Sequence, residues 1–159
     1  MNCQEQLEQY LRDRQVAYQI QHHPQAYTAQ QIAKCEHISG KKVAKSVVVL
    51  ADNKQVLLVL PASHRVDLDK VRAHLGAQNV GLAQEEEFRS NFPNCEVGAM
   101  PPFGNLYSIP VYVEPSLTRQ ENIVFPIGTH TETMSLKYAD FERLVQPTVA
   151  EFALKPMLV

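Results

Sequence analysis

A lysine stands at the start of one of the most apolar stretches of the chain. Lys45 opens the run "KSVVVL" and, counted by twos along a strand, shares a face with Val47 and Val49. An ammonium group that is buried without a partner costs free energy. Either the stem of Lys45 packs while its charge reaches water, or the charge lies at the floor of a cleft and binds a phosphate, a carbonyl oxygen or a developing oxyanion.

A stretch rich in glycine and proline, "GAMPPFG", occupies residues 98–104. Pro101 and Pro102 fix two φ angles and remove two backbone donors, whereas Gly98 and Gly104 allow positive φ and close approach of a ligand to the backbone. Such a preset loop, with open N–H groups nearby, suits recognition of an ester or a ribose terminus. The alternative is a stiff connection between a helix and the next strand.

A third stretch, "GTH" at residues 128–130, lies between two predicted strands. A corner of this composition is typical of a hairpin in which the Thr129 hydroxyl ties down the turn. It could equally supply a hydroxyl and an imidazole to a pocket, and His130 is then a candidate general base.

Several familiar catalytic and metal-binding motifs are absent from the sequence. It contains no GxSxG, no P-loop and no GxGxxG, so serine-hydrolase, nucleotide-hydrolase and dinucleotide-binding functions have little support. It also lacks HExxH, and His22 and His23 would point to opposite faces of a strand. We therefore expect no metal and no cofactor.

Three cysteines stand far apart, at Cys3, Cys35 and Cys95. Their odd number and wide spacing predict reduced thiols rather than a disulfide framework. Nothing in the sequence places a histidine beside Cys35 or Cys95, so buried, inert thiols are expected at these two positions.

The composition is that of one globular domain. The 159 residues are 45% hydrophobic and 20% charged, and no apolar run approaches the ~20 residues of a membrane span. The polar N-terminus does not resemble a signal peptide, so we expect a cytoplasmic protein that has no membrane partner. The net charge of −2 excludes a uniformly basic nucleic-acid binder but leaves room for a local patch at Lys41, Lys42 and Lys45.

Apolar periodicity predicts helices and strands that are interspersed without strict βαβ alternation. Helices are predicted at 3–14, from a capping box of Thr28 and Gln31 to about 37, and at 68–75, 84–92 and 139–145. Strands are predicted at 16–21, 43–50, 55–60, 79–83, 107–113, 122–128 and 131–138. The second and third strands should form a hairpin that is buried on both faces. This pattern favours an α+β domain with a mixed, largely antiparallel sheet flanked by helices.

The last residues, 147–159, form a tail after the final predicted helix of the domain. Thr148 and Glu151 have capping-box spacing, which predicts a short helix. The apolar end "MLV" either docks on the core or meets a partner.

The chain resembles the YbaK/ProX family over about residues 3–146. The resemblance lies in the order of three features: the lysine at the start of the first core strand, the G-x-x-P-P-F-G loop and the Gly-Thr corner. These proteins are free-standing relatives of the insertion editing domain of bacterial prolyl-tRNA synthetase. The resemblance implies that residues 1–146 form an editing domain with a curved sheet. It also implies that this domain hydrolyses the ester of mischarged aminoacyl-tRNA in trans.

The resemblance also implies roles for particular residues. The essential lysine of the family corresponds to Lys45, and its Gly-Ser/Thr corner near the aminoacyl pocket corresponds to Gly128 and Thr129. The loop that lies at the terminal adenosine and the ester corresponds to Gly98, Pro101, Pro102, Phe103 and Gly104. The sequence of this loop differs from that of family members that edit cysteine or alanine, so neither substrate is assigned to this chain.

An aminoacyl ester is already activated, so its hydrolysis needs a positioned water and a stabilised oxyanion rather than a covalent nucleophile. On this hypothesis Lys45 anchors the terminal nucleotide or the carbonyl, and backbone N–H groups around 98–104 and Gly128 stabilise the oxyanion. Lys41 and Lys42 would contact acceptor-stem phosphates, or else form a solvated charge run. The side chains proposed for the wall of the amino-acid pocket, which are equally plausible as core, are Met100, Phe103 and Ile127.

A non-catalytic module that binds aminoacyl-tRNA or an amino acid, and acts through a protein partner, is the competing function. Lys45 would bind the ligand in both cases, but a module protects the ester whereas an enzyme shortens its lifetime. The sequence leaves open the edited amino acid, the tRNA, the oligomeric state and any contact with an aminoacyl-tRNA synthetase. It also leaves open the proton-transfer group, since the tRNA 2′-hydroxyl or the side chain of the amino acid could direct the water.

Overall fold

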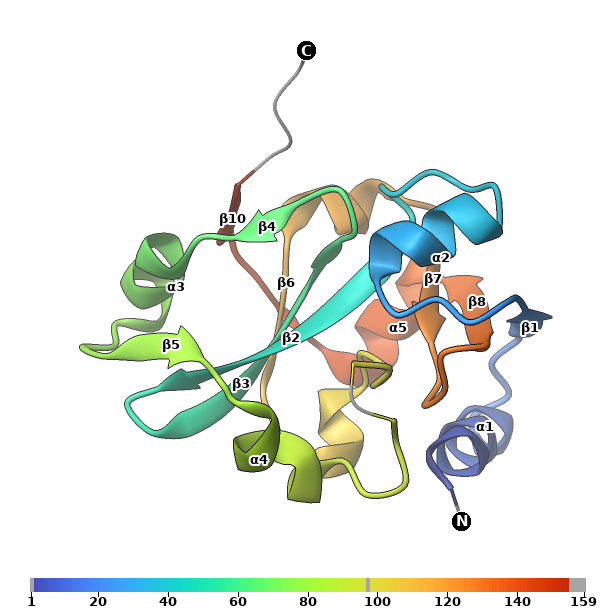
Figure 1. Ribbon diagram of the computed structural model, residues 1–159, viewed down its shortest axis with the longest axis horizontal. Coiled ribbons are helices and arrows are strands. Elements are labelled where there is room, and N and C mark those ends of the chain that lie inside the picture. Colours follow the sequence, from blue (N-terminus) through green and yellow to red (C-terminus); the bar gives the residue numbers. More distant parts are fainter. Residues whose placement is uncertain (1, 97, 155–159) are drawn as a thin grey trace.

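The structure is a computed structural model that describes residues 2–96 and 98–154. Its central sheet has the strand order β5-β2-β3-β6-β9 (Figure 1). The strands are β5 (Val80–Leu82), β2 (Ala44–Ala51), β3 (Lys54–Pro61), β6 (Val111–Val113) and β9 (Thr148–Val149). β2 runs antiparallel to β3 and β5, whereas β3–β6 and β6–β9 are parallel pairs. The sheet is therefore mixed, as predicted.

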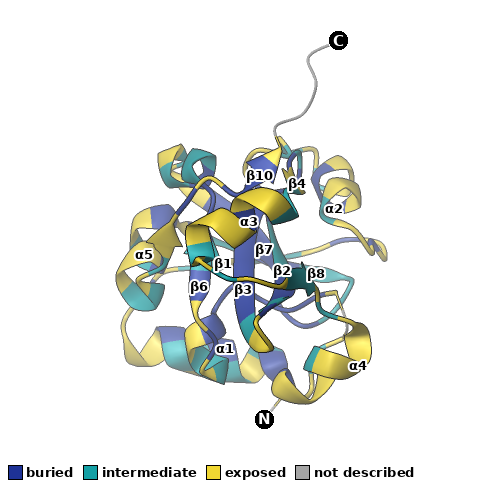
Figure 2. Cartoon of the chain, turned by 90° about the vertical axis from the view of Figure 1, so that its left-hand side faces the viewer, coloured by how far each residue is buried: buried dark blue, intermediate teal, exposed yellow. Residues whose placement is uncertain are grey.

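The hairpin of β2 and β3 is the longest pairing in this sheet. A two-residue turn joins the strands, and its residues Asp52 and Asn53 have φ values of 50° and 69°. Positive φ at both positions is the type I′ geometry, which matches the twist of a hairpin. β3 is buried from Val56 to Pro61, and Figure 2 shows it in dark blue at the centre of the molecule. The predicted burial on both faces is confirmed for β3 from Val56 onward, whereas β2 is only partly buried, with Lys45, Ser46, Val47 and Leu50 partly exposed.

One face of the hairpin packs toward a second, antiparallel sheet in the order β1-β8-β7. These strands are β1 (Gln19–His22), β8 (Glu132–Lys137) and β7 (Asn122–Pro126). The helices α1 (Cys3–Asp13) and α5 (Tyr138–Val145) contribute Leu7, Leu11 and Phe141 to the same core. The main hydrophobic core therefore lies between the two sheets and these helices.

The other face of the hairpin packs against α3 (Leu68–Leu75). The carboxylate of Asp67 caps this helix by accepting from the N–H of Asp69 at 3.0 Å, and Gly76 ends it in the left-handed conformation. β4 (Arg65–Val66) precedes α3 and pairs with β10 (Ala153–Leu154) beside it (Figure 1). Both predicted ends of the helix are confirmed.

α2 (Ala29–Cys35) begins at the predicted capping box. The Thr28 hydroxyl accepts from the N–H of Gln31 at 3.1 Å, and the Gln31 side chain accepts from the N–H of Thr28 at 3.3 Å. Ile32 of α2 packs in a small cluster with Val43, just before β2. This contact places α2 beside the start of β2, where Lys45 lies.

Two predicted elements are shorter than expected. The helix predicted at 84–92 is α4 (Glu85–Phe88) followed by the 3₁₀ turn η1 (Arg89–Asn91). The strand predicted at 107–113 is only β6, because η2 (Gly104–Tyr107) and a left-handed Ser108 precede it. A further 3₁₀ turn, η3 (Pro115–Arg119), follows β6.

The short helix predicted in the tail is wrong for its described part, which forms β9 and β10 instead. β9 extends the central sheet beside β6, and the N–H of Ala150 donates to Val113 O at 3.1 Å. Phe152 is buried against the second core. The hydrogen bonds of the sheet and the burial of Phe152 stabilise the strands more than the capping spacing of Thr148 and Glu151 stabilises a helix. The "MLV" end lies outside the described residues.

The prediction of three reduced cysteines is also wrong. Cys3 and Cys95 form a disulfide with a Cα–Cα distance of 5.2 Å, and Cys35 is a free, exposed thiol rather than a buried one. The partners are 92 residues apart in sequence, and the fold brings the start of α1 beside the segment that follows η1. The number and spacing of the cysteines in the sequence do not show that Cys3 and Cys95 lie close together in the fold.

Candidate active site

A small cleft of about 40 Å³, here called the Lys45 cleft, lies between α2 and the start of β2. The segment 26–32 forms one wall and carries Tyr27 and Ile32. The residues that line it from elsewhere in the chain are Lys45, Ser46, Gly98, Pro126 and His130. Three predicted site residues from distant parts of the sequence, Lys45, Gly98 and His130, therefore meet in one cleft.

Lys45 is half-buried, and no carboxylate among residues 2–96 and 98–154 forms an ion pair with it. Burial, followed by the nearby charge of Arg65, lowers the pKa of the Lys45 ammonium. An unpaired cation in a partly desolvated cleft attracts a phosphate, a carbonyl oxygen or an oxyanion more strongly than one in water.

His130 lies between an aromatic ring and a carboxylate. Its side chain is 13% exposed, and its ring centroid is 4.8 Å from that of Tyr27. Nε2 of His130 is 3.7 Å from Oε2 of Glu96, and the same oxygen accepts from the backbone N–H of His130 at 3.0 Å. Glu96 was not among the predicted site residues, because 34 positions separate it from His130 and no local pattern signals the pair.

Backbone hydrogen bonds join the start of the 98–104 loop to the 128–130 corner. The N–H of Glu96 donates to Gly128 O, and the N–H of Gly128 donates to Ala99 O, both at 2.8 Å. Gly98 adopts a φ of 84°, and a Cβ on it would lie 3.7 Å from His130. These bonds fix Gly98 against His130. They also use the N–H of Gly128, which is therefore not free to bind an oxyanion, and this corrects the expectation for that donor.

Gly128 and Thr129 line a different hollow of about 170 Å³, together with Ile127, Cys3 and Glu96. The N–H of Thr131 donates to the Thr129 hydroxyl at 3.5 Å, which is a turn contact. The structure thus brings Gly128 and Thr129 next to His130 in the chain but not into the Lys45 cleft.

The rest of the 98–104 loop is buried. Met100 and Phe103 belong to the main core, and Phe103 packs between Phe125 and Phe141. Pro101, Pro102 and Gly104 are also buried, and Ile127 is a core residue as well. A Cβ at Gly104 would lie 2.6 Å from Ile109 O, so packing against backbone accounts for this glycine.

Lys41 and Lys42 are exposed just before β2. The backbone carbonyl of Lys42 also accepts a hydrogen bond from the N–H of Val124 in β7 at 3.0 Å. Both lysines therefore stand on the surface close in sequence to the Lys45 cleft.

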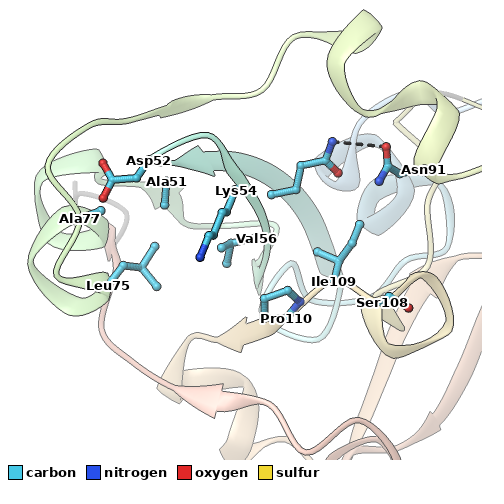
Figure 3. Close-up of a pocket in the computed structure, with 11 residues that line it drawn as sticks. Ala51, Asp52, Lys54, Val56, Leu75, Ala77, Asn91, Ser108, Ile109 and Pro110 are labelled. Atoms are coloured by element: carbon cyan, nitrogen blue, oxygen red, sulfur yellow. Dashed lines mark hydrogen bonds between the residues drawn. The ribbon is translucent and has the colours of Figure 1, made fainter.

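A larger hollow of about 640 Å³ lies at the turn of the β2–β3 hairpin (Figure 3). Lys54, Leu75 and Pro110 point into it, and it contains none of the predicted site residues. Its Asp52 carboxylate already caps the N–H of Asn79 at 2.9 Å. We place the candidate site at the smaller cleft, where the unpaired cation and the imidazole lie.

Two further properties bear on the class of site. In the described part of the chain, histidine, cysteine and acidic side chains form no group of three that could hold a metal ion. No helix found there is long and apolar enough to cross a membrane.

Comparison with known proteins identifies the class of this chain as that of the aminoacyl-tRNA editing hydrolases. The sequence model of the aminoacyl-tRNA editing domain matches residues 23–144, and the chain belongs to this family. The Escherichia coli K12 protein named multifunctional Ser/Thr-tRNA deacylase ProXp-y is 29% identical over 136 residues, which are 79% of this chain and 81% of that protein. Proteins named as deacylases hydrolyse aminoacyl-tRNA esters, so the predicted class of enzyme is confirmed.

Longer relatives contain a similar segment. The proline–tRNA ligase of Bacillus mycoides KBAB4 is 33% identical over 81 residues, which are 51% of this chain and 14% of the ligase. A solved structure described as a candidate trans-editing enzyme for prolyl tRNA synthetase aligns with a TM-score of 0.82 at 20% identity. That alignment covers 97% of this chain and 98% of the other. Another solved structure, of the hypothetical protein APE2540, has a TM-score of 0.83 at 17% identity, with 93% and 99% of the two chains covered. These two structures show the same α+β fold.

Proposed function

We propose that this protein acts in trans, in the cytoplasm, to hydrolyse the ester that joins a wrong amino acid to the 3′ end of a tRNA. The observation that carries the proposal is the half-buried Lys45, which has no carboxylate ion-pair partner among the described residues, in a cleft with Gly98 and His130. A free-standing editing domain must bind an anionic tRNA end and polarise one carbonyl, and this cleft contains groups for both.

Lys45 binds the substrate. Its ammonium group interacts with the ester carbonyl or with the terminal phosphate, and the backbone N–H of Gly98 is the loop donor to the developing oxyanion. The hydrogen bonds around Ala99 and Gly128 fix this loop before the substrate arrives, so little reorganisation is needed at the moment of reaction.

His130 acts on the water. The imidazole removes a proton as the water oxygen attacks the ester carbon, and the proton then passes to the ribose oxygen as its bond to the carbonyl carbon breaks. The products are a free amino acid and an intact tRNA hydroxyl. Glu96 positions the imidazole and offsets the positive charge that forms on it. No covalent nucleophile is needed, because the ester is already activated.

The size of the Lys45 cleft favours a small amino acid. A space of about 40 Å³ excludes bulky side chains, so selection works largely by exclusion. The similar Escherichia coli protein is named for seryl- and threonyl-tRNA, and the ligases with a similar segment are named for proline. Serine, threonine and alanine on several tRNAs, proline tRNA included, are therefore the first esters to test. Contact with an aminoacyl-tRNA synthetase would be one source of tRNA selection.

The test is the lifetime of each aminoacyl-tRNA in this panel with the wild type and with Lys45→Ala. We expect rapid loss of at least one ester, and a fall of about 10²-fold or more in that rate for the variant. Lys54→Ala is the matched control, because Lys54 is an exposed lysine at the opposite end of the hairpin. Protection of the esters, or no change with any of them, would favour the binding module that the sequence left open.

A further inference from the structure

Ser46 follows Lys45 on β2 and lines the same cleft. Its hydroxyl oxygen is buried, and no group among the described residues forms a hydrogen bond with it. Buried hydroxyls nearly always have a partner in folded proteins, because an unpaired one has lost its bonds to water without replacing them. An unpaired buried hydroxyl in a binding cleft points to a ligand that completes it.

The neighbouring side chains do not supply this partner. Ala26, Ile32 and Pro126 present apolar groups to the cleft. Thr28 also lines it, but its hydroxyl already accepts from the N–H of Gln31 as the cap of α2. Tyr27 lines the cleft too, and its hydroxyl donates to Gln25 Oε1 at 2.8 Å. The other polar side chains of the wall belong to Lys45 and His130, which the proposed mechanism uses.

Covalent catalysis by Ser46 does not fit the geometry. A nucleophilic serine needs a base within about 2.6–3.2 Å that removes its proton. The Ser46 oxygen has no hydrogen-bond partner of any kind among the described residues, and His130 is held against Tyr27 and Glu96. The hydroxyl is thus suited to binding rather than to attack.

We propose that Ser46 is a specificity-determining residue that hydrogen-bonds the side-chain hydroxyl of the misacylated amino acid, so that the preferred substrates are seryl and threonyl esters. This inference rests on the proposed function and adds the substrate class to it. A hydroxyl both donates and accepts hydrogen bonds. The side chains of serine and threonine can therefore form a hydrogen bond with the Ser46 hydroxyl, whereas that of alanine cannot. Alanine is small enough to enter the cleft but leaves the Ser46 hydroxyl unpaired.

The experiment compares seryl and alanyl esters on one and the same tRNA, so that the tRNA contribution cancels. The proteins are the wild type, Ser46→Ala, Ser46→Thr and the control Ser90→Ala, an exposed serine on η1. We expect the ratio of seryl to alanyl hydrolysis rates to fall about 10-fold in Ser46→Ala. Ser46→Thr retains a hydroxyl and should keep the preference for serine, and Ser90→Ala should keep the wild-type ratio.

Thermal unfolding gives a second measurement, because a purely structural role of Ser46 would lower the Tm of the Ser46→Ala variant. Removing an unpaired buried hydroxyl should leave the Tm of Ser46→Ala equal to or above that of the wild type. An active wild type whose seryl-to-alanyl ratio is unchanged by Ser46→Ala overturns the inference and leaves the proposed function standing. A wild type that hydrolyses none of the esters overturns both.

Discussion

At the scale of single residues, the proposed chemistry depends on Lys45, a lysine whose charged form is disfavoured by burial. Burial disfavours the charged form of Lys45, and Arg65 adds to this effect, so its pKa is lowered. The folded protein therefore binds this proton less tightly than the unfolded chain does, and the charge at neutral pH is a cost to stability. Such a cost is typical of a side chain that is held for a ligand rather than for packing.

The lowered pKa of Lys45 predicts how deacylation depends on pH. If the protonated ammonium binds the carbonyl, activity is present below the folded pKa and is lost as pH rises through it. This loss should begin below the pH at which an ordinary lysine with a pKa of 10.5 would lose its proton. The measurement is kcat/KM against pH after subtraction of spontaneous ester hydrolysis. Activity that rises steadily to pH 10.5 would assign Lys45 the role of a base instead.

Glu96 is predicted to act through His130. Glu96→Gln keeps an oxygen that can accept from the N–H of His130 but removes the charge that lies 3.7 Å from Nε2. We expect kcat to fall about 10-fold with KM nearly unchanged, because the carboxylate acts on the proton transfer and not on substrate binding. The exposed Glu86 provides the control, Glu86→Gln, which should behave as the wild type. A rise in KM alone would instead make Glu96 a binding residue.

At the scale of elements, the candidate site depends on how Glu96, Gly98 and Ala99 are held against the 128–130 corner. The Cys3–Cys95 disulfide joins the residue before Glu96 to α1, and the Tyr107 hydroxyl lies 3.4 Å from Cys3 Sγ. Gly128 lies directly over Cys3, where a Cβ would come within 2.8 Å of the Cys3 Cβ. Glycine is needed there both for space and for its φ of 103°.

Gly128→Ala is therefore expected to destabilise the fold by roughly 1–3 kcal/mol, since it combines a strained φ with a clash. Gly81→Ala in β5 is the control, because no atom lies within 4 Å of a Cβ at that position and its φ is ordinary. Chemical denaturation of the two variants gives the comparison. Equal free energies of unfolding for Gly128→Ala and the wild type would contradict the packing described for this corner.

Elements whose causes are local were predictable from the sequence, and contacts between distant elements were not. The β2–β3 hairpin, the capping box of Thr28 and the end of α3 at Gly76 follow from runs of a few residues. The disulfide and the pairing of β9 with β6 depend on tertiary approach, which no local pattern encodes. The same division holds for the site: Lys45 and Gly98 were candidates, while Glu96 and Ser46 became visible only through their neighbours.

At the scale of the whole molecule, a weakly acidic protein must attract a polyanion. The net charge is −2, so general electrostatic attraction is not available, and we propose the exposed Lys41 and Lys42, close in sequence to Lys45, as a local basic patch instead. These two lysines stay predictions for the contact with the acceptor stem.

The patch predicts a salt dependence. Lys41→Gln with Lys42→Gln should weaken tRNA binding and reduce the slope of log K against log salt by about 0.7–0.9 for each phosphate that the variant no longer neutralises. The double variant Lys54→Gln with Lys137→Gln changes the net charge equally at two exposed positions elsewhere, and should leave the slope nearly unchanged. Equal slopes for both double variants would show that total charge, and not this patch, governs binding.

The central claim is that the ester binds in the Lys45 cleft. It is tested most directly by an experimental structure of the protein with 3′-serylamino-3′-deoxyadenosine, in which an amide that resists hydrolysis replaces the ester. We predict that its carbonyl oxygen lies within hydrogen-bond reach of Lys45 Nζ and the Gly98 N–H, with the seryl hydroxyl against Ser46. Binding in the hollow at the hairpin turn, or with the carbonyl away from Lys45, would contradict the claim.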